Sequence, residues 1–256
     1  MDRLDFAIKL SRDVGFYLLR YWGKALNVRE KSSFQDLVSD CDLEAQRIIV
    51  EKIQKSYPND SILAEEGLFE TGNKIWIIDP IDGTMNYVHG LPSFGVAIAY
   101  AENNEVVMGV INDPIMGETF YALRGQGAFV NGERIRVSQT GKLKNSIGNI
   151  GFYVGFTGKF INAVETRVRR IRMTGSAVIG GAYVACGRFD FFIARKANPW
   201  DIAPLLVIMP EAGGVVTDIQ GERATLNSGN YVFSNGLFHD ELLNVISSVE
   251  EDSTVD

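Results

Sequence analysis

Residues 75–87, with the sequence IWIIDPIDGTMNY, constrain the fold most, because a continuous apolar run there ends in two carboxylates. An apolar run without polar alternation is typical of a strand buried on both faces. A buried carboxylate such as Asp79 or Asp82 is costly unless a cation or several donors satisfy it. Two unit charges about 4 Å apart repel by about 4 kcal/mol at an effective dielectric near 20. We therefore expect a bound cation at this strand end.

Gly83 and Thr84 follow the second carboxylate directly. Glycine permits a sharp turn, and a helix that begins there would turn its free N–H groups toward whatever the carboxylates hold. Such helix starts attract phosphate. One peptide thus predicts acidic ligands, a divalent metal and a phosphate-binding turn.

Two other acidic segments are ambiguous when each is considered alone. Glu65 and Glu66 end a short apolar strand at residues 62–64, and a solvated loop is the commoner interpretation of such a pair. Asp201 stands at the start of an expected helix over residues 202–212, where an N-cap is the commoner role. The company of the first segment favours a ligand role for Glu65 and Glu66, whereas the residues alone leave Asp201 as an N-cap.

The composition excludes several classes of protein. The 256 residues are 46% hydrophobic and 22% charged, as in soluble globular proteins. A net charge of −7 argues against nucleic-acid binding, so no DNA partner is expected. No apolar run approaches the roughly 18 residues of a membrane span, and no signal peptide is apparent, so we expect no membrane association and a cytoplasmic location. The basic cluster at residues 167–172 could face an anionic substrate, an acidic partner or solvent.

The spacing of apolar residues predicts the main elements. Amphipathic helices are expected over residues 2–22 and 43–57, with Asp42 as the N-cap of the second. Residues 94–137 alternate short β-like runs with turn residues, which predicts an antiparallel meander. Residues 142–159 show no clear pattern.

Three motifs together resemble the inositol monophosphatase family of magnesium-dependent, lithium-sensitive phosphatases. They are residues 65–67, 76–87 and 199–203, and they occur in the order found in that family. The resemblance covers about residues 5–245. It implies an α/β (α+β) layered sandwich of alternating helices and sheets, as in inositol monophosphatases and fructose-1,6-bisphosphatases. Residues 1–256 would form a single unit, with an N-terminal part (1–140) that holds an antiparallel sheet and a C-terminal α/β part (141–256) packed against it.

The resemblance also implies two or three bound Mg²⁺ ions, with Mn²⁺ as a possible substitute. By motif, Glu65, Asp79 and the carbonyl of Ile81 would hold one ion. Asp79, Asp82 and Asp201 would hold a second, and Glu65 would also bind a weaker third. Ligands that are all oxygen suit such hard ions.

The catalytic residues implied by the resemblance are Asp36, Glu65 and Thr84, and the pair formed by Thr84 and Asp36 would position and deprotonate the attacking water. Glu66 would lie near the metal ions and support their ligands without binding an ion itself. The residues expected to bind the substrate come from two segments. They are Asp82, Gly83, Thr84, Gly175, Ser176 and Ala177.

One position departs from the animal enzymes of this family. A glutamate that contacts inositol hydroxyls there is replaced by Ala194 here, and the chain looks more like broad-specificity prokaryotic members. We therefore expect a Mg²⁺-dependent phosphomonoesterase that acts on small polyol or sugar phosphates, with inositol 1-phosphate as the first candidate. The alternatives are a fructose-1,6-bisphosphatase or NADP phosphatase and a regulatory binding protein on the same fold. A homodimer or homotetramer is expected from the resemblance.

Overall fold

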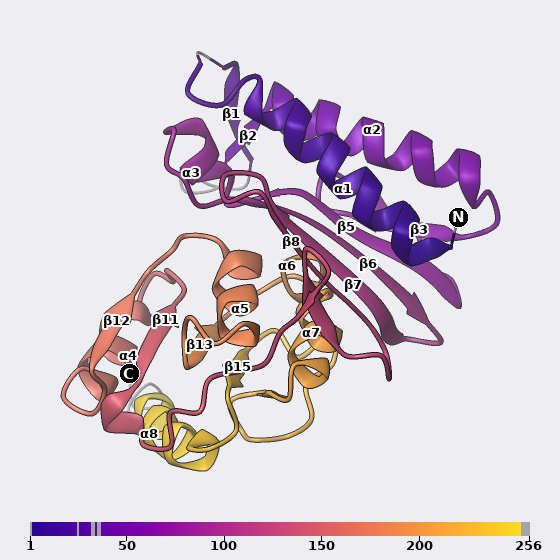
Figure 1. Cartoon of the computed structure of the whole chain (residues 1–256). Coiled ribbons are helices and arrows are strands. Elements are labelled where there is room, and N and C mark those ends of the chain that lie inside the picture. Colours follow the sequence, from indigo (N-terminus) through magenta and orange to yellow (C-terminus); the bar gives the residue numbers. More distant parts are fainter. Residues whose placement is uncertain (1, 25, 32–33, 35–36, 252–256) are drawn as a thin grey trace.

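The computed structural model describes residues 2–24, 26–31, 34 and 37–251. Helices and sheets alternate in layers: an outer helix pair, a large sheet, a central group of helices, a smaller sheet and a second outer helix pair (Figure 1). This order confirms the expected layered α/β class. Within the described part of the chain, every helix is too short or too polar to span a bilayer.

The first outer pair consists of α1 (Arg3–Leu19) and α2 (Asp40–Ser56), which cover one face of the large sheet (Figure 1). Both helices were expected, with bounds a few residues different. In α1, the buried side chains of Leu10, Val14 and Leu18 recur every four residues and pack onto the sheet. The hydrophobic face therefore fixes how this helix lies.

The start of α2 corrects an expectation. Ser39, not Asp42, is the N-cap, since the Ser39 hydroxyl accepts a hydrogen bond from the N–H of Cys41 at 3.2 Å. Asp42 lies three residues into the helix and accepts from the N–H of Ser39 at 2.8 Å, which completes a capping box. The helix consequently begins about one turn earlier than its apolar pattern indicated.

The large sheet has eight strands in the order β10-β9-β8-β7-β6-β5-β3-β4. Within this sheet, β3 and β5 form the one parallel pair, and the other neighbouring strands are antiparallel. In chain order, the strands are β3 (Ser61–Ala64), β4 (Leu68–Phe69), β5 (Lys74–Asp82), β6 (Gly95–Glu102), β7 (Glu105–Asp113), β8 (Glu118–Leu123), β9 (Ala128–Val130) and β10 (Glu133–Arg134). The run from β6 to β10 confirms the antiparallel meander.

Strand β5 is buried on both faces, as its apolar run predicted. Trp76 and Ile78 pack toward α1 and α2, whereas Ile77 packs toward the central helices. All residues of the strand from Trp76 to Asp82 are buried. The strand thus carries its two carboxylates into the interior, where they cannot be hydrated freely.

The central helices are α5 (Ala177–Ala185), α6 (Pro199–Ile202) and α7 (Leu205–Glu211). The expectation of one helix over residues 202–212 is wrong, because the chain forms two helices separated at Ala203 and Pro204. Proline has no N–H with which to continue a ladder of helical hydrogen bonds. Pro204 is instead the N-cap of α7.

The smaller sheet has five strands in the order β12-β11-β13-β15-β14, and α4 and α8 cover its outer face (Figure 1). Residues 142–159, which showed no clear pattern, contain β11 and the start of α4. The elements of this layer are β11 (Ile147–Ile150), α4 (Thr157–Val164), β12 (Arg170–Arg172), β13 (Phe191–Ala194), β14 (Val215–Thr217), β15 (Tyr231–Ser234) and α8 (His239–Glu251). Four short elements remain: β1 (Val28–Glu30), β2 (Leu37–Ser39), α3 (Thr84–Val88) and the 3-10 turn Leu143–Asn145.

Gly109 in β7 is where the main chain between α6 and α7 touches the large sheet. A Cβ atom at Gly109 would lie 2.6 Å from the carbonyl oxygen of Pro204 and 2.7 Å from its Cα. We therefore expect Gly109→Ala to lower the free energy of unfolding by about 1–3 kcal/mol, because main-chain atoms must move. Urea denaturation measures this effect. Gly141→Ala is the control, since nothing lies within 4 Å of its Cβ position, and equal midpoints for the two variants would contradict the expectation.

His239 is buried at the start of α8 between two hydroxyl groups. The hydroxyl of Thr217 donates to the carbonyl of Asp218 at 2.6 Å, so it accepts from Nε2–H of His239 at 2.9 Å. Nδ1 then accepts from the hydroxyl of Ser234 at 2.8 Å. Burial lowers the pKa of His239, and the charge of Asp240 opposes that shift only in part. The fold therefore favours the neutral imidazole.

The stability that His239 contributes should be complete above the unfolded pKa of about 6.5 and should be lost as pH falls toward its lower folded pKa. We expect the unfolding midpoint at pH 8 minus that at pH 5 to be smaller, or more negative, in His239→Gln than in the unaltered protein. Comparing the two proteins isolates this residue from the buried carboxylates, whose raised pKa values act in the opposite direction. His89→Gln, at an exposed histidine, is the control, and the same reduction there would contradict the assignment.

Candidate active site

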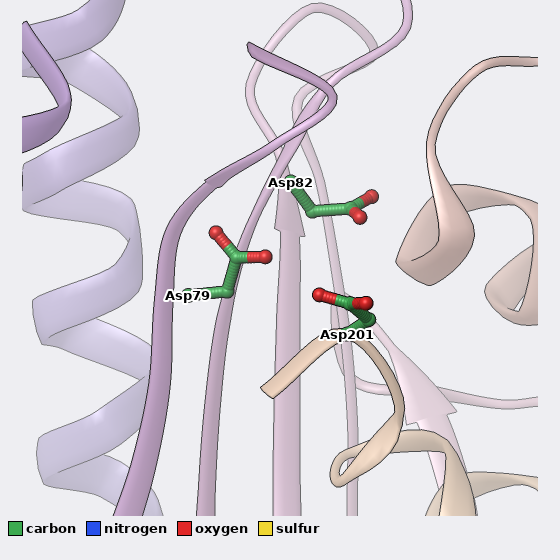
Figure 2. A group of neighbouring side chains, drawn as sticks. All are labelled: Asp79, Asp82 and Asp201. Atoms are coloured by element: carbon green, nitrogen blue, oxygen red, sulfur yellow. The ribbon is translucent and has the colours of Figure 1, made fainter. Parts of the chain in front are cut away.

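Three carboxylates meet where β5 ends. One oxygen each from Asp79, Asp82 and Asp201 lies within 4.8 Å of the other two, and Figure 2 shows the side chains pointing toward a common space. The pairing of β5 with β6 is irregular between Asp79 and Asp82. Because side chains alternate along a regular strand, such an irregularity helps to turn residues three apart toward the same space.

Asp201 reaches this space from α6, more than a hundred residues later in the chain. It is the third residue of that helix, and its carboxylate accepts from the N–H of Asn198 at 2.8 Å in a capping box. Asp201 therefore takes part in capping α6, although the N-cap itself is Asn198. Since a carboxylate has two oxygens, the capping contact and a place in the acidic group are compatible.

The three carboxylates strongly disfavour one another's charge. Burial, followed by the charges of Glu65, Asp82 and Asp201, raises the pKa of Asp79 well above its usual value. Burial and the charge of Asp82 do the same to the pKa of Asp201. Burial also raises the pKa of Asp82 to about 6, against the effect of donors that include the hydroxyl of Ser176. A divalent cation would remove the repulsion that raises the first two values.

Glu65 lies beside this group with one oxygen bound and the other without a partner. Lys31 donates from Nζ to Oε1 of Glu65 at 2.8 Å and to Glu66 at 2.5 Å. The second oxygen of Glu65, Oε2, is buried and has no hydrogen-bond partner among the described residues. Gln46 holds the loop through the main-chain N–H and C=O of Glu66, at 2.9 and 3.0 Å.

This donor set fits a hard divalent cation such as Mg²⁺. Every candidate ligand atom is an oxygen, and an unsatisfied buried carboxylate oxygen is costly unless a cation contacts it. Glu65 is not one of the residues that meet within 4.8 Å, but its charge acts on Asp79. An ion between these two residues, in addition to one within the group of three, is consistent with this placement.

The hydroxyl of Thr84 is bound to a carboxylate in the described part of the chain, that of Asp42. Its hydroxyl contacts Oδ1 of Asp42 at 2.9 Å and the carbonyl oxygen of Ile81 at 3.0 Å. Asp42 is fully buried and also accepts from the main chain and hydroxyl of Ser39, at 2.8 and 2.5 Å. Asp36, the expected partner, lies outside the described residues. In the sequence Asp42 was interpreted as an N-cap, and the spacing of Ser39 and Asp42 is indeed that of a capping box.

Gly83 must be glycine for two reasons. Its φ of +92° is in the left-handed region, and a Cβ atom there would lie 3.0 Å from the carbonyl oxygen of Ser93 and 3.2 Å from that of Gly175. The helix that follows, α3, is only five residues long. The turn therefore lies tightly against the second expected substrate segment.

The loop at residues 174–177 is held to Asp82 at one end and to Asn86 of α3 at the other. The hydroxyl of Ser176 hydrogen-bonds to Asp82, and the N–H of Val178 donates to the same carboxylate at 3.1 Å. Asn86 of α3 donates from Nδ2 to the carbonyls of Ser93 at 2.6 Å and Thr174 at 2.8 Å. Two segments about ninety residues apart are thus held together beside the carboxylates.

Two remaining sequence features lie apart from this group. Ala194 is fully buried at the end of β13 and has no polar side-chain atom to offer a ligand. The side chains of the basic cluster are exposed, with Arg170 and Arg172 on the edge strand β12. This placement agrees with the solvent-facing interpretation of the cluster.

Comparisons with known proteins agree with this geometry. The model of the inositol monophosphatase family matches residues 2–251. A Thermotoga maritima protein named fructose-1,6-bisphosphatase/inositol-1-monophosphatase is 55% identical over 252 residues, 98% of each chain. A Xylella fastidiosa protein named Nus factor SuhB is 38% identical over 86% of this chain and 83% of its own length. The solved structure of the Thermotoga maritima IMPase has a TM-score of 0.96 at 55% identity, over 98% of this chain and 99% of that one. The chain therefore belongs to the inositol monophosphatase family of phosphatases.

Proposed function

We propose that this phosphatase hydrolyses phosphate monoesters of small polyols or sugars, with inositol 1-phosphate as the first substrate, and that it binds two or three Mg²⁺ ions to do so. The observation that carries the proposal is the convergence of Asp79, Asp82 and Asp201 within 4.8 Å, beside the unpartnered oxygen of Glu65. When bound, divalent cations would neutralise charge on the phosphoryl group and lower the pKa of a water molecule. Mn²⁺ would serve as a substitute ion.

The residues around Thr84 would hold the attacking water. The Thr84 hydroxyl has one proton, which lies toward Asp42 and the Ile81 carbonyl, so its oxygen lone pairs can accept a hydrogen bond from water. Asp42 is fixed by three donors and can hold Thr84 in this orientation. We assign Asp42 this role in place of Asp36, and we keep Glu65 as a further catalytic residue that contacts the ions.

The phosphate and the alcohol would occupy different sides of the carboxylates. On the phosphate side, the N–H groups of Gly83 and Thr84 are the proposed donors. On the alcohol side, the proposed contacts are Asp82 and the loop of Gly175, Ser176 and Ala177. Glu66 would act indirectly, because it shares Lys31 with Glu65.

A second candidate is hydrolysis of fructose 1,6-bisphosphate, or of the 2′-phosphate of NADP, at the same site. The name of the Thermotoga maritima relative joins fructose-1,6-bisphosphatase to inositol-1-monophosphatase, which favours a dual activity here. A regulatory binding role is a third candidate, supported by the relative named Nus factor SuhB. The retention of Glu65, Asp79, Asp82, Thr84 and Asp201 favours the enzyme. Lithium sensitivity, a homodimer or homotetramer and a cytoplasmic location remain predictions.

Substitution of Asp79 separates the metal role from a structural role. We expect Asp79→Asn to lower kcat/KM by at least about 100-fold, because ligands that hold a catalytic metal are worth several kcal/mol. Mg²⁺ at about a hundred times its Kd should raise the Tm of the unaltered protein by about 5–10 °C, and that of the variant by much less. Asp13→Asn, at an exposed aspartate of α1, is the control. Near-normal turnover and an unchanged Mg²⁺ shift in Asp79→Asn would refute the metal assignment.

A substrate panel tests the proposed activity directly. Phosphate release is measured from inositol 1-phosphate, fructose 1,6-bisphosphate, NADP and adenosine 3′,5′-bisphosphate, each with and without Mg²⁺. We expect Mg²⁺-dependent release, with the highest kcat/KM on inositol 1-phosphate. A higher value on fructose 1,6-bisphosphate or NADP would support the second candidate, and inactivity on all four would support the binding role.

A further inference from the structure

A cavity of about 170 Å³ lies beside the carboxylate group and next to the Gly83 turn. The loop of Gly175, Ser176 and Ala177 forms part of its lining, and the aromatic residues Phe152 and Tyr153 form another part. Because the hydroxyl of Ser176 hydrogen-bonds to Asp82, this cavity adjoins the acidic group directly. A phosphate monoester with its phosphoryl group at the carboxylates would extend its alcohol into this cavity.

The ring of Tyr153 is held in a defined position in this cavity. It folds back over Gly151, where a Cβ atom would lie 2.5 Å from Cε2 of the ring and 2.6 Å from the phenol oxygen. The N–H of Tyr153 donates to the hydroxyl of Thr157 at 2.5 Å, and Gly151 donates from its N–H to the carbonyl of Ile193 at 3.0 Å. The hydroxyl is thus placed by a glycine, a threonine and the neighbouring strand.

The phenol of Tyr153 retains a proton that it can donate. Burial, together with the charges of Asp201 and Asp82, raises the pKa of Tyr153 to about 12, against the effect of the Arg195 main-chain N–H, which donates to the phenol oxygen. The cavity that Tyr153 lines also contains Ser176, whose hydroxyl hydrogen-bonds to Asp82. With its oxygen already accepting from Arg195, the phenol's O–H is oriented by a fixed partner and remains a donor.

Resting on the proposed function, we propose that Tyr153 is a specificity-determining residue, whose phenol donates a hydrogen bond to a hydroxyl group of the alcohol half of the substrate. The class of ligand is a hydroxylated ring or chain, such as an inositol or a hexose, with one apolar C–H face against the aromatic wall. Of the aromatic residues that line the cavity, Phe152, Tyr153 and Phe192, the tyrosine carries the hydroxyl group, so its phenol is the aromatic wall's hydroxyl donor. A phosphate ester without hydroxyl groups would gain nothing from this contact.

The test compares Tyr153→Phe with the unaltered protein on two substrates, inositol 1-phosphate and phenyl phosphate. The variant keeps the ring and removes only the donor. We expect kcat/KM on inositol 1-phosphate to fall by about 3- to 10-fold, the value of one neutral hydrogen bond, and kcat/KM on phenyl phosphate to stay unchanged. Tyr100→Phe is the matched control, since it removes a phenol that contacts Glu102 at 3.2 Å in β6, and it should alter neither value.

Each outcome bears on the inference. An equal loss on both substrates would mean that the hydroxyl of Tyr153 supports the fold or the carboxylates, and it would overturn the inference. Unchanged values on both substrates would overturn it as well. If the unaltered protein hydrolysed phenyl phosphate but not inositol 1-phosphate, the inference would stand only if Tyr153→Phe lowered activity on another hydroxylated ester, such as fructose 1,6-bisphosphate, by the expected factor. If no ester were hydrolysed in the presence of Mg²⁺, the proposed function would be overturned, and this inference with it.

Discussion

The repulsion among buried carboxylates at the end of β5 is the constraint on which the rest of this structure depends. The fold brings Asp79 and Asp82 into the interior on a strand buried on both faces, and α6 adds Asp201 to the same space. Like charges at such distances destabilise an isolated folded chain. The fold retains this arrangement while the hydrophobic layers on both sides hold the strand in place. Repulsion among these carboxylates therefore lowers the free energy of unfolding of the ion-free protein, while their arrangement suits a bound cation.

Contacts between the layers bring the segments that carry the site residues close together. Contact between β7 and the chain before α7 places α6 against the large sheet, because Gly109 leaves room for the main chain of Pro204. Asn86, in the helix after β5, joins this region to the loop before α5 by donating to the carbonyl of Thr174. In the same way, Asp42 both caps α2 and holds Thr84. Residues that look purely structural in sequence therefore orient the residues proposed for chemistry.

The sequence predicted this site in part, for reasons that particular residues make clear. The apolar run before Asp79 was sufficient to predict a buried strand with a charge problem at its end. Asp201 and Glu65 were assigned as ligands only by resemblance. Along the chain, a ligand at these positions has the same local pattern as an ordinary N-cap or an ordinary loop glutamate. Asp42 was missed because a capping box and a hydroxyl-binding carboxylate are indistinguishable along the chain. Strand β11 was missed because its pairing with β12 and β13 is non-local and Gly148 and Asn149 carry no strand pattern.

The central claim is that the space between these carboxylates is a cation site. Anomalous scattering from crystals grown with Mn²⁺ tests it most directly, because the ion is located without reference to activity. The account predicts a peak bounded by Asp79, Asp82 and Asp201, and a second peak next to Glu65. Crystals that show Mn²⁺ elsewhere on the protein and none among these side chains would contradict it.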